Sequence, residues 1–442
     1  MLAQATFIDV PGPTVSAERR HAPSWAEARQ LAYHCAGPLP PLNLRPADAI
    51  GRTLTANITA SQDLPHYASS AMDGWAINGN GPWVMTTAGL PLSPGEASVI
   101  ATGGLIPAGA AAVLRKESGV VVDGAGGARQ LTLKPDAKLG ETLPGRHIRP
   151  AGEEASAGEV LIPAGTLLNP AHIALAAVAG SDELQVQPKP SVAVVLTGSE
   201  VVTSGEPAPG QVRDAFGPQL DTVISQLGGE PRGQIRIGDS YDEWLAALAG
   251  GQAGSLAGGQ AGSLAGGQAG PLPDVTITTG GTGKSGTDHF RDAIAALGGR
   301  LLLDGIAMRP GHPAVMAELP DGRFVIGLPG NPLAAMMALM TLGEPLLAAL
   351  GNRPLQSAVL MTSGADIDPD PGRTRLVPCT LVHDLVFPAS HTGPGMMRGL
   401  AWADGYMAVP PAGAAAGTPV QVLPLPWTTS FSSEVRTRVP MV

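Results

Sequence analysis

The chain has 442 residues, enough for two to four domains of ordinary size, about 100–200 residues each. Its formal net charge of −10 and the absence of any lysine/arginine run argue against a nucleic-acid-binding protein. Two cysteines far apart, Cys35 and Cys379, exclude a disulfide framework. The first residues lack a basic start followed by an apolar core, so we expect no signal peptide and a cytoplasmic protein.

The N-terminal part of the chain combines one helix with many short strands. Ser24 and Glu27 have the spacing of a capping box, which predicts a helix over 25–36. Between about 50 and 145, β-type runs alternate with glycine and proline turns, which predicts a small β-rich domain. These runs lie at 83–87, 112–115, 119–122 and 130–133.

From about residue 190 strands and helices alternate. Strands are predicted at 191–196, 234–237, 274–279 and 323–328, and helices at 216–227, 242–248, 288–297 and 333–350. This alternation predicts a parallel sheet with helices on both faces, whose ligands bind beyond the carboxyl ends of the strands. The segment after about 352 returns to β-type runs.

Two stretches need separate interpretation. The uncharged segment 325–343 is long enough for a membrane span, but Pro329, Asn331 and Pro332 near its start favour a strand, a turn and a buried helix. The unit GGQAGSLA begins at residue 250 and repeats at 258. Its small side chains cannot form a core, so we predict a flexible loop over 250–270.

The glycine-rich segment 279–285 follows a predicted strand but does not fit a nucleotide-binding P-loop. The first glycine of that motif would be Thr278, and Lys284 is not at the start of the next helix. A glycine turn at a strand end still exposes backbone N–H groups to an anion.

Several charged residues have both a structural and a functional interpretation. Asp288 fits a helix N-cap, and Glu200 fits a solvated loop residue, but two carboxylates at one sheet edge could also hold Mg²⁺ or move protons. The turn 309–313, with Arg309 and His312, is either a surface turn or an oxyanion site. In the segment 70–75, Asp73 is either a turn former or a functional residue.

The order of motifs resembles the molybdopterin molybdenumtransferase family, which includes the E domain of gephyrin. Residues 70–76 (SAMDGWA) are similar to the family's SAMDGYA, and 197–200 (TGSE) to TGDE. Gly280 and Gly281 keep the family's spacing to Asp288, 309–313 is similar to KPGKP, and 327–332 (GLPGNP) is identical to the family string. Similar motifs run from about residue 24 to 425.

The resemblance implies an α/β multidomain protein with a central doubly wound, mostly parallel sheet of the pterin-binding fold and β-rich accessory domains. The implied domains are a discontinuous linker domain (1–50 and 145–189), an inserted β-rich domain (51–144), a molybdopterin-binding domain (190–350) and a C-terminal β domain (351–442). It also implies a homodimer. The active site would be shared, with Asp73 of one chain against the pterin domain of the other.

The implied activity inserts molybdenum from molybdate into adenylylated molybdopterin, with Mg²⁺, and releases AMP. Four residues are implied to be catalytic: Asp73, Thr102, Glu200 and Asp288. The Mg²⁺ would be held by Asp288 and Glu200. The implied pterin-site residues are Thr197, Gly198, Gly280, Gly281, Pro329, Gly330, Asn331 and Pro332, and the molybdate residues are Arg309, His312 and Arg373. A pterin adenylyltransferase would act upstream and molybdoenzymes downstream, without nucleic acid or membrane partners.

The chain departs from the family pattern at several of these positions. The family's VSVG is replaced by 282–285 (TGKS), the aspartate of TGDE by Ser199, and the two lysines of KPGKP by Arg309 and His312. A catalytically weak molybdopterin-binding or scaffold protein is therefore the alternative. A pterin adenylyltransferase shares the central fold, but the additional domains argue against it.

Overall fold

The structure is a computed structural model that describes residues 22–124, 127–250, 271–283 and 288–428. The chain forms two compact units, one from Met1–Leu39 with Lys189–Val442 and the other from Pro40–Pro188. The predicted repeat loop, after Gly250, lies outside the described residues, as do Lys284 and Ser285. The predicted α/β multidomain class is confirmed.

A six-stranded sheet forms the centre of the first unit. Four neighbouring strands are parallel, and the next strand, β20, is antiparallel to its neighbours on both sides, which confirms the mostly parallel sheet. The order is β16 (Glu230–Ile237), β13 (Ser191–Thr197), β17 (Val275–Thr279), β21 (Phe324–Leu328), β20 (Val315–Glu318) and β18 (Arg300–Asp304).

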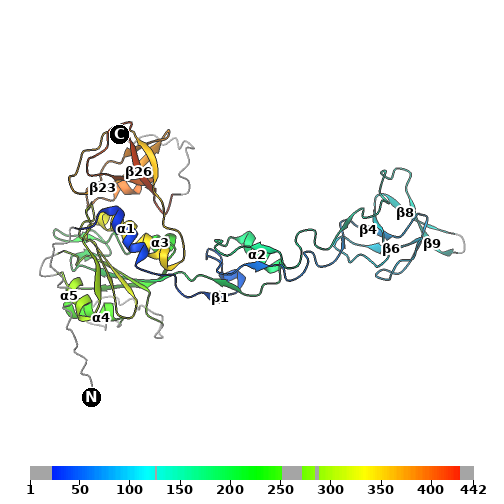
Figure 1. The fold of residues 1–442 in the computed structure, drawn as a ribbon, viewed down its shortest axis with the longest axis horizontal. Coiled ribbons are helices and arrows are strands. Elements are labelled where there is room, and N and C mark those ends of the chain that lie inside the picture. Colours follow the sequence, from blue (N-terminus) through cyan, green and yellow to red (C-terminus); the bar gives the residue numbers. More distant parts are fainter. Residues whose placement is uncertain (1–21, 125–126, 251–270, 284–287, 429–442) are drawn as a thin grey trace, which may run out of the picture. The chain divides into compact units, whose positions relative to one another are not determined.

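Each face of this sheet has its own core. Side chains alternate along a strand, so Val194 and Leu196 of β13 pack on one face and Val195 on the other. The first face is covered by α1 (Trp25–His34), α3 (Leu220–Gln226) and the long helix described below; the second by α4 (Tyr241–Ala249) and α5 (Phe290–Ala296). Figure 1 shows α4 and α5 on one side of the sheet and α1 and α3 on the other.

The long helix after β21 is irregular. It consists of α6 (Pro332–Ala338), a π-helical turn at Leu339–Gly343 and α7 (Glu344–Leu350). By length and composition it could cross a membrane, but the apolar window is entirely buried inside the protein. The prediction of a strand, a turn and a buried helix for this segment is confirmed.

Helix α1 begins as the capping box predicts. The Ser24 hydroxyl accepts from the Glu27 N–H at 3.3 Å, and the Glu27 carboxylate accepts from the Ser24 N–H at 2.8 Å. Trp25, Ala28 and Ala32 join the core of the central sheet. The chain through Leu39 therefore packs with the first unit.

The C-terminal part of the first unit is a closed β structure. β23 (Thr374–Val382) pairs with both β24 (Leu385–Pro388) and β25 (Gly405–Val409), and β22 (Val359–Ser363) and β26 (Pro419–Pro424) complete the ring. A two-residue strand, β19 (Met308–Arg309), pairs with the start of β23. A short helix, α8 (Arg398–Ala401), follows β24. The turn after β13 carries a further small pair, β14 (Val201–Val202) with β15 (Val212–Arg213).

The second unit contains a six-stranded, mostly antiparallel sheet. Its order is β7 (Ala112–Arg115), β4 (Gly74–Ile77), β6 (Glu96–Ile100), β5 (Trp83–Met85), β9 (Arg129–Leu133) and β8 (Gly119–Asp123). A separate core in this unit surrounds α2 (Pro170–Val178). The remaining elements are β1 (Leu42–Leu44) with β12 (Leu184–Val186), a 3-10 turn (Pro46–Asp48), β2 (Ile58–Thr59) with β11 (Val160–Ile162), and β3 (Ser69–Ser70) with β10 (Ile148–Arg149).

Candidate functional site

Three turns meet at the carboxyl edge of the central sheet. They follow β13, β17 and β21, which are neighbours in the sheet. The Thr197 hydroxyl donates to the Thr279 carbonyl, and the Gly280 N–H donates to the Leu328 carbonyl at 2.9 Å. The structure therefore brings together the glycine and proline turns that the sequence placed at this edge.

The second turn requires glycine at two successive positions. Gly280 and Gly281 have φ angles of 79° and 64°, in the left-handed region. A Cβ on Gly280 would lie 2.7 Å from the Thr197 hydroxyl oxygen, and one on Gly281 would lie 2.4 Å from the Trp244 indole. Successive residues in this conformation can turn backbone N–H groups towards an anion.

Glu200 folds back over the first turn. Its side chain is exposed, and a Cβ on Gly198 would lie 2.8 Å from its Oε2 atom. Gly198 has a φ angle of 114°, so both its conformation and the carboxylate above it favour glycine. The Glu200 carboxylate is thus available at the sheet edge.

Asp288 is not the N-cap residue of the next helix. Helix α5 starts at Phe290, and its N-cap residue is His289, whose own side chain makes no capping hydrogen bond. The Asp288 carboxylate instead lies against the glycine turn, since a Cβ on Gly283 would be 2.7 Å from its Oδ2 atom. Arg291 fixes this turn by donating to the carbonyls of Thr282 and Gly283 at 3.1 and 2.7 Å. The capping role considered for Asp288 is therefore wrong.

A third carboxylate at this edge, Asp239, was missed by the sequence reasoning. It follows the edge strand β16. Its Oδ2 accepts from the Ser199 hydroxyl at 3.0 Å, and its backbone carbonyl lies 3.0 Å from His289 Nε2. Asp239 thus contacts the neighbours in sequence of both Glu200 and Asp288. Its position directly after a strand was the available signal.

The Pro-Gly-Asn-Pro turn leads into α6 and contacts the C-terminal β structure. Pro332 is the first residue of α6, and Asn331 is its N-cap residue without a side-chain capping bond. The Ala334 N–H donates to the Pro394 carbonyl at 3.1 Å. A Cβ on Gly395 would lie 3.5 Å from Asn331 Oδ1. The loop around Pro394 therefore lies beside this turn.

The three residues expected at molybdate lie near the start of β23. Arg309 Nη1 is 3.5 Å from Asp370 Oδ2, and the Arg373 N–H donates to the Asp370 carbonyl at 3.0 Å. His312 Nδ1 is 2.7 Å from the Ile306 carbonyl, which can only accept, so Nδ1 carries a proton and Nε2 is the atom left to bind a ligand. All three side chains are exposed.

Asp73 and Thr102 lie together in the second unit. Asp73 Oδ1 accepts from the Thr102 N–H at 2.7 Å and from its hydroxyl at 2.9 Å. The backbone bond, followed by the hydroxyl bond, lowers the pKa of Asp73. Gly74 must follow, because a Cβ there would lie 2.0 Å from the Leu114 carbonyl oxygen. The expected site residues thus fall into two groups, one in each unit.

Among the described residues, no three His, Cys, Asp or Glu side chains are grouped as ligands for one metal ion. Mg²⁺ commonly uses only one or two protein carboxylates and takes its other ligands from water and substrate phosphates. Glu200 and Asp288, both beside glycine turns at the sheet edge, match that smaller donor set.

Comparisons with known proteins match nearly the whole described chain. The MoeA N-terminal region (domain I and II) matches residues 23–180, a probable molybdopterin binding domain matches 193–349, and the MoeA C-terminal region (domain IV) matches 361–425.

Similar proteins and structures carry related names. A molybdopterin molybdenumtransferase of Nostoc sp. is 30% identical over 69% of this chain and 68% of its own length. Molybdopterin molybdenumtransferase 2 of Mycobacterium tuberculosis is 28% identical over 86% of this chain and 94% of its own length. A molybdopterin biosynthesis moeA protein from Pyrococcus horikoshii superposes with a TM-score of 0.61 at 21% identity, over 91% of this chain and 99% of its own. A second structure, of the molybdopterin biosynthesis moea protein from Pyrococcus horikosii, superposes with a TM-score of 0.68 at 25% identity. The match covers 92% of this chain and 99% of that chain.

Proposed function

The chain belongs to the molybdopterin molybdenumtransferase family, a family of transferases in molybdenum cofactor biosynthesis, and from that membership we propose that it transfers molybdenum from molybdate to adenylylated molybdopterin and releases AMP. Water cleaves the phosphoanhydride bond, which gives AMP and a terminal phosphate on the pterin. The two dithiolene sulfurs bind molybdenum, and one molybdate oxygen leaves as water with the two thiol protons.

The observation that carries this proposal is the meeting of three glycine or proline turns with Glu200 and Asp288 at one sheet edge. Backbone N–H groups at such turns stabilise phosphate oxygens, and carboxylates beside them can orient water or accept its proton. Asp239, tied to both flanking loops, keeps the two carboxylate-bearing segments together. Preorganised groups of this kind lower a barrier because they need little rearrangement during the reaction.

Mg²⁺, when bound, would offset the charge of the phosphoanhydride and of departing AMP. Glu200 and Asp288 are the carboxylates that would hold it. Arg309 and His312 would face molybdate together with Arg373. In the structure Arg309 points to Asp370, so an anion would compete with that carboxylate for the guanidinium.

We place Asp73 and Thr102 in the same reaction through a homodimer. In such a dimer Asp73 of one chain would face the central sheet of the other, and each dimer would have two equivalent sites. The substrate would come from a pterin adenylyltransferase and the product would go to molybdoenzymes, all in the cytoplasm.

The proposal is tested by molybdate-dependent release of AMP. The purified protein is incubated with adenylylated molybdopterin and Mg²⁺, with and without molybdate, beside Glu200→Gln, Asp288→Asn and a protein-free control. We expect AMP release that requires molybdate and falls at least about 100-fold in the two variants.

A different outcome would identify the alternative function. Tight binding of the pterin, with AMP release no faster than in the protein-free control, would favour a binding or scaffold protein. The substituted segment 282–285, where Thr282 and Gly283 stand in place of family residues, is the feature behind that alternative.

A further inference from the structure

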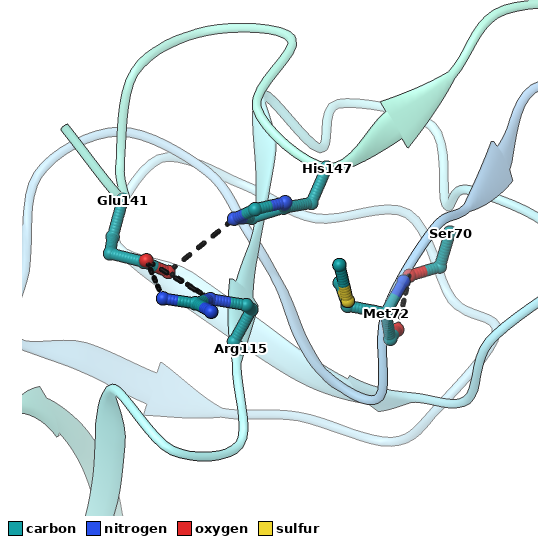
Figure 2. A network of polar contacts seen from close by, with 5 residues as sticks. All are labelled: Ser70, Met72, Arg115, Glu141 and His147. Atoms are coloured by element: carbon teal, nitrogen blue, oxygen red, sulfur yellow. Dashed lines mark hydrogen bonds and ion pairs between the residues drawn. The ribbon is translucent and has the colours of Figure 1, made fainter. Parts of the chain in front are cut away.

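A buried ionic network lies beside the turn that carries Asp73. The Glu141 side chain is only 2% exposed and accepts from Arg115 Nε at 3.0 Å (Oε1) and 3.2 Å (Oε2), and from Arg115 Nη2. His147 Nε2 is buried beside this pair, 3.6 Å from Glu141 Oε2, and makes no hydrogen bond with any described residue. Figure 2 shows Arg115 and His147 converging on the Glu141 carboxylate, with the Met72 side chain pointing towards the same cluster.

Arg115 supplies the charge that balances Glu141 at neutral pH. Burial lowers the pKa of His147; Glu141 opposes this shift, while Arg146 and Arg115 add to it. The imidazole is therefore neutral near pH 7. Arg115, by contrast, holds the pKa of Glu141 below its usual range, so the pair is fully ionised.

The same two residues anchor the Asp73 turn through their backbones. The His147 carbonyl accepts from the Ala71 N–H at 2.9 Å, and β10, which follows His147 directly, pairs with Ser69 and Ser70. On the other side of the turn, Arg115 is the β-sheet partner of Gly74, and the next residue, Lys116, donates its N–H to the Asp73 carbonyl at 2.9 Å.

The turn also has an internal restraint. The buried Ser70 hydroxyl donates to the Met72 carbonyl at 2.5 Å and accepts from the Met72 N–H at 3.3 Å. The segments before and after Asp73 are thus both tied to the network, while Asp73 itself is exposed and bonded to Thr102. Burying a charged pair gives little stability compared with apolar packing, and in some proteins it serves instead to specify one geometry.

We propose that Glu141, through Arg115 and His147, is a positioning residue that holds Asp73 in its hydrogen bonds with Thr102. Glu141 contacts the backbone supports of the turn and acts on the reaction only through Asp73. The proposal rests on the proposed function, because it assigns Asp73 a part in molybdenum transfer.

The test replaces the buried carboxylate by an amide. In Glu141→Gln, which keeps the size but loses the charge, we expect hydrogen exchange of the Thr102 amide to accelerate about tenfold. The kcat for AMP release should fall by about the same factor, with KM within about twofold of wild type. The matched control is Asp48→Asn, which breaks an exposed Arg45–Asp48 pair in the same unit and should change neither quantity.

A double variant separates positioning from general destabilisation. In Asp73→Asn the Thr102 bond is weakened directly, so adding Glu141→Gln should not accelerate Thr102 exchange further. Arg115→Lys keeps the charge but loses the two-pronged contact, so it should also accelerate Thr102 exchange, by a smaller factor than Glu141→Gln. If Glu141→Gln does not fold, Arg115→Lys takes its place in the test.

Two results would overturn the proposal: unchanged Thr102 exchange in folded Glu141→Gln, or faster exchange with unchanged kcat. If the wild-type protein releases no AMP, the proposed function fails. The exchange measurement still decides whether Glu141 positions Asp73.

Discussion

Gly198 shows how a single residue controls the position of a proposed catalytic group. A Cβ at Gly198 would meet the Glu200 carboxylate at 2.8 Å, whereas nothing lies within 4 Å of a Cβ at nearby Gly205. Both glycines have positive φ angles, 114° and 72°, so alanine is strained at each, but only Gly198→Ala displaces Glu200.

We therefore expect Gly198→Ala to lower kcat for AMP release at least about tenfold and Gly205→Ala to leave it within about twofold. Both variants should lose a similar amount of stability, of order 1 kcal/mol. Thermal unfolding and initial rates of the two proteins measure this difference. Equal kcat values in the two variants would contradict the assigned position of Glu200.

The Asp73–Thr102 pair predicts a pH effect. Two hydrogen bonds from Thr102 lower the pKa of Asp73, the backbone N–H more than the hydroxyl. Thr102→Ala removes only the hydroxyl, so the Asp73 pKa should rise but stay below its ordinary value, and the carboxylate should protonate at higher pH than in wild type. NMR titration of the Asp73 carboxyl measures the shift, and Thr102→Ser is the control. Identical titrations in the alanine and serine variants would show that the hydroxyl has no effect.

At this scale the sequence showed which residues to examine but not how they pair. Asp73 and Thr102 were both named as functional, yet they are 29 positions apart and only the sheet brings them together. Asp288 fitted a cap by residue type, but Arg291 in the first turn of α5 binds the carbonyls of Thr282 and Gly283, and the helix starts only at Phe290. Asp239 was missed because its position after a strand, the one signal it offers, belongs to no motif that the sequence reasoning used.

At the scale of elements, Arg29 of α1 makes two polar contacts with the buried helix from α6 to α7. Arg29 Nη1 donates to the Met340 carbonyl in the π-helical turn at 2.9 Å, and Arg29 Nη2 pairs with Glu344 at 2.9 Å. Burial raises the pKa of Glu344, and Arg29 opposes that shift. The long helix supports the Pro-Gly-Asn-Pro turn, so this pair bears on the site.

Arg29→Met should lower the free energy of unfolding by about 3 kcal/mol or more at pH 7, because a buried carboxylate loses its partner. Glu344→Gln in the same chain should recover part of the loss. The Glu344 pKa of the single variant should rise further above its unfolded value. The loss of unfolding free energy in Arg29→Met is then fully present at neutral pH. It shrinks as the pH falls towards 5, because Glu344 becomes protonated and no longer needs a partner. Urea denaturation at both pH values measures this, and a deficit that grows on acidification would contradict the ionic assignment.

Strongly patterned elements were predictable and short ones were not. The strand at 191–196 and the helix at 333–350 have long apolar runs, and both exist within a residue or two. The antiparallel pair β18 and β20 was missed. β20 (Val315–Glu318) includes Ala, Met and Glu, which have low or moderate β-propensity, and it forms a strand by pairing with β21 on one side and β18 on the other. The π-helical turn lies in a run of buried residues that has no polar face, so no change of hydrophobic periodicity could signal it.

At the scale of the whole molecule, the proposed residues are divided between two units: Asp73 and Thr102 in one, Glu200 and Asp288 in the other. The mostly parallel sheet followed from the alternation of strands and helices. The membership of α1 in the first unit did not, because its apolar face specifies burial but no partner.

A shared site in a homodimer makes a quantitative prediction for mixed dimers. If Asp73→Ala and Asp288→Ala are each inactive, a mixed dimer has one site with both lesions and one with neither. Random mixing makes about half of the dimers mixed, so activity should recover to roughly a quarter of wild type. The two variants are refolded together, with two tags to confirm exchange. Confirmed mixed dimers without activity would rule out the shared site.

The transfer itself is tested most directly by the amount of molybdenum bound to the pterin product for each AMP released in a single turnover. The product is separated from free molybdate, its molybdenum is measured by mass spectrometry, and AMP is measured in the same sample. If the protein couples cleavage to insertion, one molybdenum atom should appear on the pterin for each AMP, and omission of molybdate should abolish both. AMP released with no molybdenum on the pterin would instead show a phosphoanhydride hydrolase and contradict the proposed transferase.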